Sequence, residues 1–158
     1  MELLRRYLPL SRIIMIIAVA ALVMGSVFIF QGVTKANWMS DAMRLEQVTI
    51  GLGHDDIEAP EGEYVDTAKE AQAAGDLIRE HRRNIAPTYN DLLGEGRYDP
   101  TNPEHLSYSQ ALNMENYLYL AVLGFGVAEM VIAAGAFMIM MGIGLGVASI
   151  AVRRPKLM

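Results

Sequence analysis

The chain has 158 residues, of which 53% are apolar, and it carries a net charge of −5 and no cysteine. The length suits one compact unit, and the apolar excess is typical of a membrane protein. The lack of cysteine excludes a disulfide framework, a thiolate metal site and a cysteine nucleophile.

The first segment, residues 1–12, carries Arg5, Arg6 and Arg12 among leucines, and we predict a cytoplasmic segment at the membrane surface. The apolar run 13–33 that follows has the length of one membrane crossing, about 20 residues. A cleavable signal peptide also has a basic start and an apolar core, but this run is long for one. Small residues recur along the segment at intervals of seven: Ser11, Ala18, Gly25 and Gly32.

The acidic middle of the chain, residues 34–116, is predicted to form a helical extracytoplasmic domain. Residues 33–115 hold seven Lys or Arg and sixteen Asp or Glu, a local charge of −9, whereas both ends of the chain are basic. We expect helices over about 34–50 and 66–86. The acidic tract 54–63 could bind a divalent cation, but it lacks the ligand spacing of a calcium loop and reads as a solvated loop.

The helix predicted over 66–86 begins at Asp66 or Thr67 and ends before Pro87. Its apolar positions are three and four residues apart, which predicts one buried stripe with the charged residues, Arg82 among them, on the other faces. The predicted stripe is Ala71, Ala74, Ile78, His81 and Ile85. Residues 87–103 are rich in proline and glycine and are expected to form a loop.

The last helix is predicted from about Tyr108, after a capping box of Ser107 and Gln110, to Val152. Its residues 117–152 are apolar apart from one charge and would extend ~54 Å, far more than the ~30 Å hydrocarbon core of a bilayer. Small residues again recur every seven positions: Ala121, Ala128, Gly135, Gly142 and Ser149. Such residues let helices approach closely, so the two series should face each other or identical spans of neighbouring copies.

The one charge in this stretch, Glu129, has two possible depths. If Tyr117 and Tyr119 mark the outer interface, Glu129 lies near the bilayer midplane, where a charge indicates a functional site. If the basic tail 153–158 marks the inner interface, the crossing is about 132–152 and Glu129 lies at its outer boundary.

We favour the second register, because Lys35 lies as far from the basic N-terminal segment as Glu129 lies from the basic tail. We therefore predict an interfacial charge pair between Lys35 and Glu129. The apolar residues beyond Glu129 would then stand outside the lipid and form an external interface: Tyr117, Tyr119, Leu120, Leu123 and Phe125.

The chain shows none of the common nucleotide-binding or hydrolase motifs, and neither apolar run contains a histidine that could bind haem. It also lacks the basic stripe typical of nucleic-acid binding. We predict an all-α membrane protein: a two-span antiparallel transmembrane hairpin with both termini cytoplasmic, a helical extracytoplasmic domain, no catalytic residues, no metal and no cofactor.

The predicted function is that of a structural or accessory subunit in the cell membrane. It would assemble with copies of itself or with other membrane subunits through its small-residue seams and its external apolar surface. The alternative is a homo-oligomeric ion channel or pore lined by the small-residue face of one span.

Overall fold

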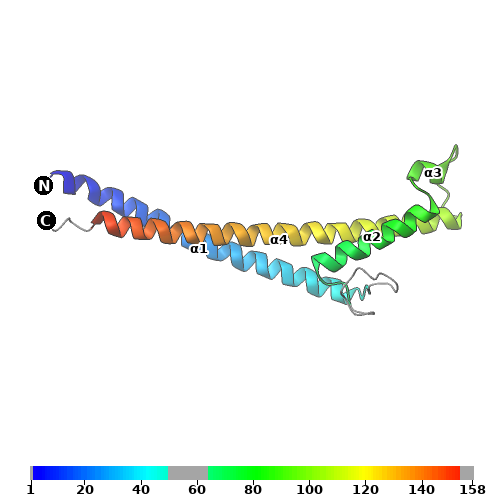
Figure 1. The fold of residues 1–158 in the computed structure, drawn as a ribbon, viewed down its shortest axis with the longest axis horizontal. Coiled ribbons are helices and arrows are strands. Elements are labelled where there is room, and N and C mark those ends of the chain that lie inside the picture. The colour runs from blue at the N-terminus through cyan, green and yellow to red at the C-terminus, as the bar shows by residue number, and fades with distance from the viewer. Residues whose placement is uncertain (1, 50–63, 154–158) are drawn as a thin grey trace. The chain divides into compact units, whose positions relative to one another are not determined.

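The computed structural model describes residues 2–49 and 64–153, and their regular structure is helical (Figure 1). Residues 154–158 and the acidic tract 54–63 lie outside the described residues, as do the side chains of Arg5 and Arg6. The helices are α1 (Glu2–Leu45), α2 (Ala68–Ile85), α3 (Tyr89–Leu93) and α4 (Pro103–Arg153). The described part contains no strand, only an isolated antiparallel bridge between Thr49 and Tyr64.

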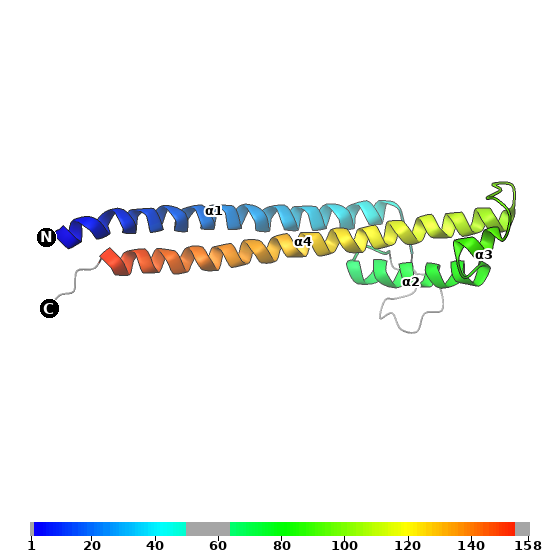
Figure 2. The ribbon, with the colours of Figure 1, turned by 90° about the horizontal axis from the view of Figure 1, so that it is seen from above.

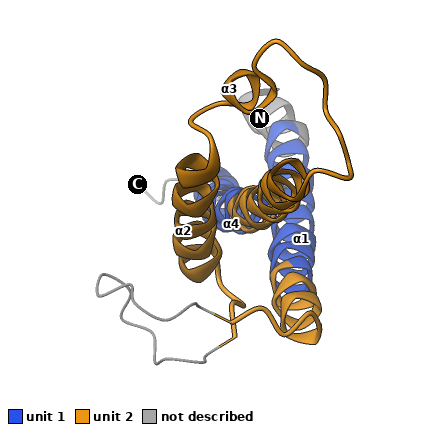
Figure 3. Ribbon diagram, turned by 90° about the vertical axis from the view of Figure 1, so that its right-hand side faces the viewer, with its two compact units in different colours: residues 1–35, 127–158 blue, residues 36–126 orange. Residues whose placement is uncertain are grey.

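The chain divides into two compact units, coloured separately in Figure 3. Unit 1 comprises residues 1–35 and 127–158 and contains the first part of α1 and the last part of α4. Unit 2 comprises residues 36–126, which include the end of α1, all of α2 and α3, and the start of α4.

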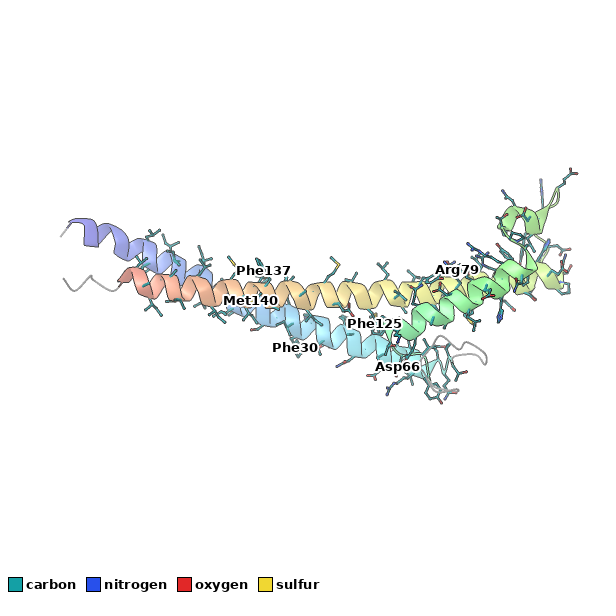
Figure 4. All side chains as sticks on the ribbon, viewed as in Figure 1. Phe30, Asp66, Arg79, Phe125, Phe137 and Met140 are labelled. Atoms are coloured by element: carbon teal, nitrogen blue, oxygen red, sulfur yellow. The ribbon has the colours of Figure 1, made fainter. Side chains whose placement is uncertain are left out.

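In unit 1 the two helices lie side by side and run in opposite directions (Figure 2). Ser11 contacts Ser149 near one end of the pair, and Gly32 lies against Ala128 near the other. Both helices are long and apolar enough to cross a membrane, and in each only 11% of the most apolar 18-residue stretch is buried. Large apolar side chains point away from the pair, as Phe30 and Phe137 do in Figure 4.

Unit 2 is built around a small core to which α1, α2 and α4 all contribute. Its buried members are Val65, Ala71, Ala74 and Leu118, and partly buried Met43, Val48, Ile78, Ala121 and Val122 pack against them. The alanines of α2 let this helix lie close to α4, because a side chain without γ atoms adds little width to the contact.

The ends of α2 follow from its sequence. The Thr67 side chain accepts a hydrogen bond from the Glu70 backbone N–H at 3.3 Å, and the Glu70 carboxylate accepts one from the Thr67 N–H at 3.0 Å. This capping box satisfies backbone donors that the first turn leaves unpaired. The helix ends at Ile85, and Ala86, the residue before Pro87, is extended, as residues that precede proline usually are.

Two predictions for residues 87–110 are wrong. The helix predicted from about Tyr108 begins at Pro103, where the missing N–H costs no hydrogen bond, and the Asn102 side chain accepts from the Glu104 N–H at 2.9 Å. Ser107 is therefore inside the helix and does not cap it. The expected loop 87–103 contains the short helix α3, capped by Thr88, whose hydroxyl accepts from the Asp91 N–H.

Candidate functional site

In unit 1 the two series of small residues lie against each other and form what we call the seam. From α1 it contains Ser11, Ala18, Gly25 and Gly32, and from α4 it contains Ala128, Gly135, Gly142 and Ser149, all of them buried. Ala121, the outermost member of the predicted series, belongs to unit 2, where it is half-buried and packs against the core.

The centre of the seam is a contact between two glycine backbones. A Cβ atom added to Gly25 would lie 2.6 Å from the Gly135 carbonyl oxygen, and one added to Gly135 would lie 2.7 Å from the Gly25 carbonyl oxygen. Gly142 is similarly close to Ala18, whose carbonyl oxygen would be 2.9 Å from an added Cβ. These positions need glycine because backbone, rather than a movable side chain, occupies the space.

One end of the seam is held by hydrogen bonds between two buried serines. The Ser11 hydroxyl donates to the Ser149 carbonyl at 3.0 Å, and the Ser149 hydroxyl donates to the Ser11 carbonyl at 2.8 Å. Each hydroxyl thus reaches across to the backbone of the other helix. Such bonds fix the register of two apolar helices, since sliding by one residue would leave both hydroxyls facing apolar surface.

Two glycines of unit 1 on α4, Gly144 and Gly146, lie away from the seam and differ from those within it. An added Cβ at Gly144 or Gly146 would meet nothing within 4 Å. Within unit 1, the glycines that closely approach the other helix are those at the heptad positions, and Gly144 and Gly146 are not needed for the contact between these two helices.

The predicted charge pair stays a prediction. Lys35 and Glu129 are both exposed, on different helices of unit 1. Because Gly32 lies beside Ala128, Glu129 is nearly level with Gln31, which places Lys35 about 6 Å further along the pair at 1.5 Å per residue. The predicted equal height is therefore off by about one helical turn.

Among the described residues of unit 2, the most deeply buried charges are those of Arg82 and Glu115, which are 8% and 7% exposed. Arg82 Nε donates to Glu115 Oε2 at 2.7 Å, Arg82 Nη1 donates to the Tyr108 hydroxyl, and the guanidinium lies 4.9 Å from the centre of the Tyr108 ring. The hydrogen bond to Glu115 raises the pKa of Arg82 above its usual value. This cluster links α2 to α4.

The Arg82 cluster corrects the stripe predicted for α2. His81 is exposed and Ile85 is 40% exposed, whereas Arg82, expected on a charged outer face, is buried. The buried face of α2 includes Arg82 because the carboxylate of Glu115 on α4 binds its guanidinium. The only sequence signal was Glu115 itself, an isolated acid within the otherwise uncharged part of the last helix.

A second contact between α2 and α4 surrounds Tyr119. Its ring lies over Gly75, where an added Cβ would approach the Cε1 atom to 3.0 Å, and its hydroxyl donates to Asp76 Oδ1 at 2.7 Å. Arg79 binds the same Asp76 carboxylate and lies 5.4 Å from the centre of the Tyr119 ring. Burial first, and then the hydrogen bond to Asp76, raises the pKa of Tyr119 to about 12.

The predicted external interface separates into covered and uncovered residues. Phe125 is buried, and Tyr119 packs against α2. Tyr117, Leu120 and Leu123 are 72%, 59% and 63% exposed, and we call these three residues the external surface. Unit 2 therefore leaves most of the predicted interface open on α4.

A groove with a volume of about 750 Å³ runs beside Tyr117 in unit 2. Its walls come from the end of α1, the residues just after it, and α4. The lining residues are Met43, Glu46, Val48, Gln110, Asn113, Met114, Tyr117, Leu118 and Ala121. Of these nine described residues, six are apolar or aromatic and only Glu46 is charged.

Among residues 2–49 and 64–153, no group of three or more His, Asp or Glu side chains is arranged to hold a metal ion. The acidic tract 54–63, which we considered for a divalent cation, lies outside these ranges. Comparison with known proteins gives no matching family model, no matching curated protein and no matching solved structure.

Proposed function

We propose that this chain is a non-catalytic integral membrane subunit of the cell membrane. In this proposal the two apolar helices of unit 1 cross the membrane as a hairpin with both termini cytoplasmic, and unit 2 is extracytoplasmic. The protein acts as a structural or accessory subunit, joined to copies of itself or to other membrane proteins through the external surface.

The main support for a membrane location is that unit 1 has its small residues inside and its large apolar residues outside. Its small residues pack inward at the seam, while its large apolar side chains, such as Phe30, Phe137 and Met140, are exposed. An exposed apolar surface of this extent is costly in water and favourable in lipid. The orientation follows from charge, since Arg and Lys cluster at both chain ends and acids predominate between the spans.

The proposed role as a subunit is supported by the apolar residues of α4 that unit 2 leaves exposed. The seam is used within the chain, so its small residues do not offer a face to a neighbouring protein. Tyr117, Leu120 and Leu123 stay exposed within seven residues of α4, while Leu118 and Phe125 on the same helix are buried. Outside the lipid, an exposed cluster of this kind is typical of a protein interface.

The test is the mass of the particle extracted from its native membrane with lipid retained. We expect a particle heavier than one chain, and we expect Leu120→Glu to reduce it to one chain. Ile85→Glu, the same kind of change at an exposed residue of α2, is the matched control and should leave the assembly intact. A single chain in the unmodified protein would overturn the subunit proposal.

Planar-bilayer recordings separate this proposal from the channel alternative. A subunit without a pore should give no conductance under voltage or membrane tension. Ion currents from the purified protein that change in Glu129→Gln would favour the pore, with Glu129 facing the ion pathway.

A further inference from the structure

The groove in unit 2 is the open side of the unit's core. Leu118 belongs both to the buried core and to the groove wall, and Met43, Val48 and Ala121, which pack against the core, are also lining residues. Because Met43, Val48 and Ala121 are only partly buried, an apolar group placed in the groove would complete the core. The favourable free energy of binding would come from removing the remaining apolar surface of the core from water.

The shape of the groove fits a helix. Its α4 wall is formed by Gln110, Asn113, Met114, Tyr117 and Ala121, whose spacing of three and four residues traces one face of α4 over about 16 Å, or three turns. A groove between two helices with such walls is the kind that accepts the apolar face of a third helix.

Two features of the wall suit a peptide occupant in particular. Met43 and Met114 are flexible and polarisable, so they adapt to the side chains of a partner. Gln110 and Asn113 offer uncharged hydrogen-bonding groups along the same face of α4. A wall of adaptable apolar groups with a few polar anchors is typical of helix-binding grooves.

Charge decides what kind of helix would bind. The residues of unit 2 include six Lys or Arg and sixteen Asp or Glu, a charge of −10. Arg44, Arg79 and Arg82 already bind the carboxylates of Asp66, Asp76 and Glu115, respectively. Among the described residues that line the groove, the one charge is the exposed carboxylate of Glu46. A second copy of this chain would bring a second unit 2 with its own charge of −10, so a basic partner is favoured over self-association.

We propose that this groove binds an amphipathic helix of a partner protein, with its apolar face on Met43, Met114 and Leu118 and a Lys or Arg against Glu46. The proposal rests on the proposed function as a membrane subunit and names the chemistry of the partner. It places the docking site in the groove next to the external surface, so that Tyr117 belongs to both.

The test uses the full chain in nanodiscs of neutral phosphatidylcholine and a fluorescent synthetic helix of leucine and lysine. A peptide of about 14 residues covers the groove at 1.5 Å per residue. Empty nanodiscs measure binding of the peptide to lipid, which is subtracted. A leucine–glutamate peptide of the same pattern is the charge control.

The decisive comparison is between Glu46→Lys and Asp41→Lys. Both residues are exposed, Asp41 on α1 and Glu46 just after its end, and both changes alter the net charge equally, but only Glu46 lines the groove. We expect Glu46→Lys to weaken binding of the leucine–lysine peptide by about tenfold or more, and Asp41→Lys by about twofold at most. Ala121→Trp, which fills the groove without changing charge, should also weaken it.

Three results would overturn the proposal: equal effects of the two lysine variants, equal binding of the leucine–glutamate peptide, or binding unaffected by Ala121→Trp. Self-association that Ala121→Trp abolishes, without peptide binding, would assign the groove to a second copy and overturn the proposal as well. These failures are distinguishable from failure of the proposed function, because the mass of the native particle does not depend on the peptide.

Discussion

Replacing Gly25 by alanine should destabilise the helix pair of unit 1, although alanine is the better helix former. The added Cβ would lie 2.6 Å from the Gly135 carbonyl oxygen, and ordinary contact begins at 3.4 Å. The two backbones must therefore separate by about 0.8 Å, and a gap of this size forfeits a quarter to a half of the attraction at each affected contact.

The size of the effect follows from two opposing contributions. Overpacking of a tight contact costs about 1 to 3 kcal/mol, whereas replacing glycine by alanine inside a helix gains about 1 kcal/mol. We expect Gly25→Ala to lower the free energy of unfolding by up to about 2 kcal/mol net. Gly144→Ala is the matched control, because its Cβ would meet nothing within 4 Å. That variant should be neutral or up to about 1 kcal/mol more stable.

The assay is separation of the two helices in bicelles titrated with sodium dodecyl sulfate, followed by energy transfer between two dyes. The chain has no cysteine, so cysteines at exposed Val19 and Met140 can carry the dyes without interference. If Gly25→Ala proves as harmless as Gly144→Ala, the backbone contact at the seam is not what holds the helices together.

Three further predictions concern unit 2. Arg82→Met should cost about 3 to 5 kcal/mol of unfolding free energy in chemical denaturation, because it leaves the Glu115 carboxylate buried without its partner. The hydroxyl of Tyr119 has its pKa raised from 10.0 to about 12, so its contribution to stability is complete below pH 10 and is lost as the pH rises through 12. Absorbance at alkaline pH should show this late ionisation, and Tyr119→Phe should remove it; ionisation near pH 10 would contradict the packing of the ring. Thr67→Ala should cost about 1 kcal/mol in the same denaturation assay, with faster amide exchange in the first turn of α2, and unchanged exchange would count against the capping box.

The all-helical fold could be predicted because two long apolar runs and the periodic segment between them leave few alternatives. The approximate span of α2 was also predictable, since Thr67 and Pro87 give local start and stop signals. The start of α4 was not, because Ser107 imitates a cap and the true signal, Asn102 followed by Pro103, also resembles a turn.

The interior of unit 2 shows where local patterns stop being informative. A periodicity argument treats every arginine as exposed, so it assigned His81 to the buried face of α2 and Arg82 to the outside. The reverse holds because Glu115, 33 residues away in sequence, compensates the arginine. A long-range partner of this kind leaves no mark in the sequence around Arg82.

The seam could be predicted only in part from the sequence. Spacing alone predicted a seam containing Gly25 and Gly135, because small residues every seven positions form one face of a helix. Spacing does not say whether that face meets the same chain or another. The reciprocal hydrogen bonds of Ser11 and Ser149 define the antiparallel register within one chain.

A disulfide at the end of the seam tests this central claim most directly. The hydroxyl oxygens of Ser11 and Ser149 are 3.2 Å apart, so a Ser11→Cys/Ser149→Cys variant has the geometry to form a disulfide bond with little backbone movement. When the variant is oxidised in lipid and run on a denaturing gel without reducing agent, it should give an internally crosslinked species of single-chain mass. The yield of this species should not change on dilution into excess lipid. Crosslinks that join two chains, or no crosslink, would show that the seam does not close within one chain.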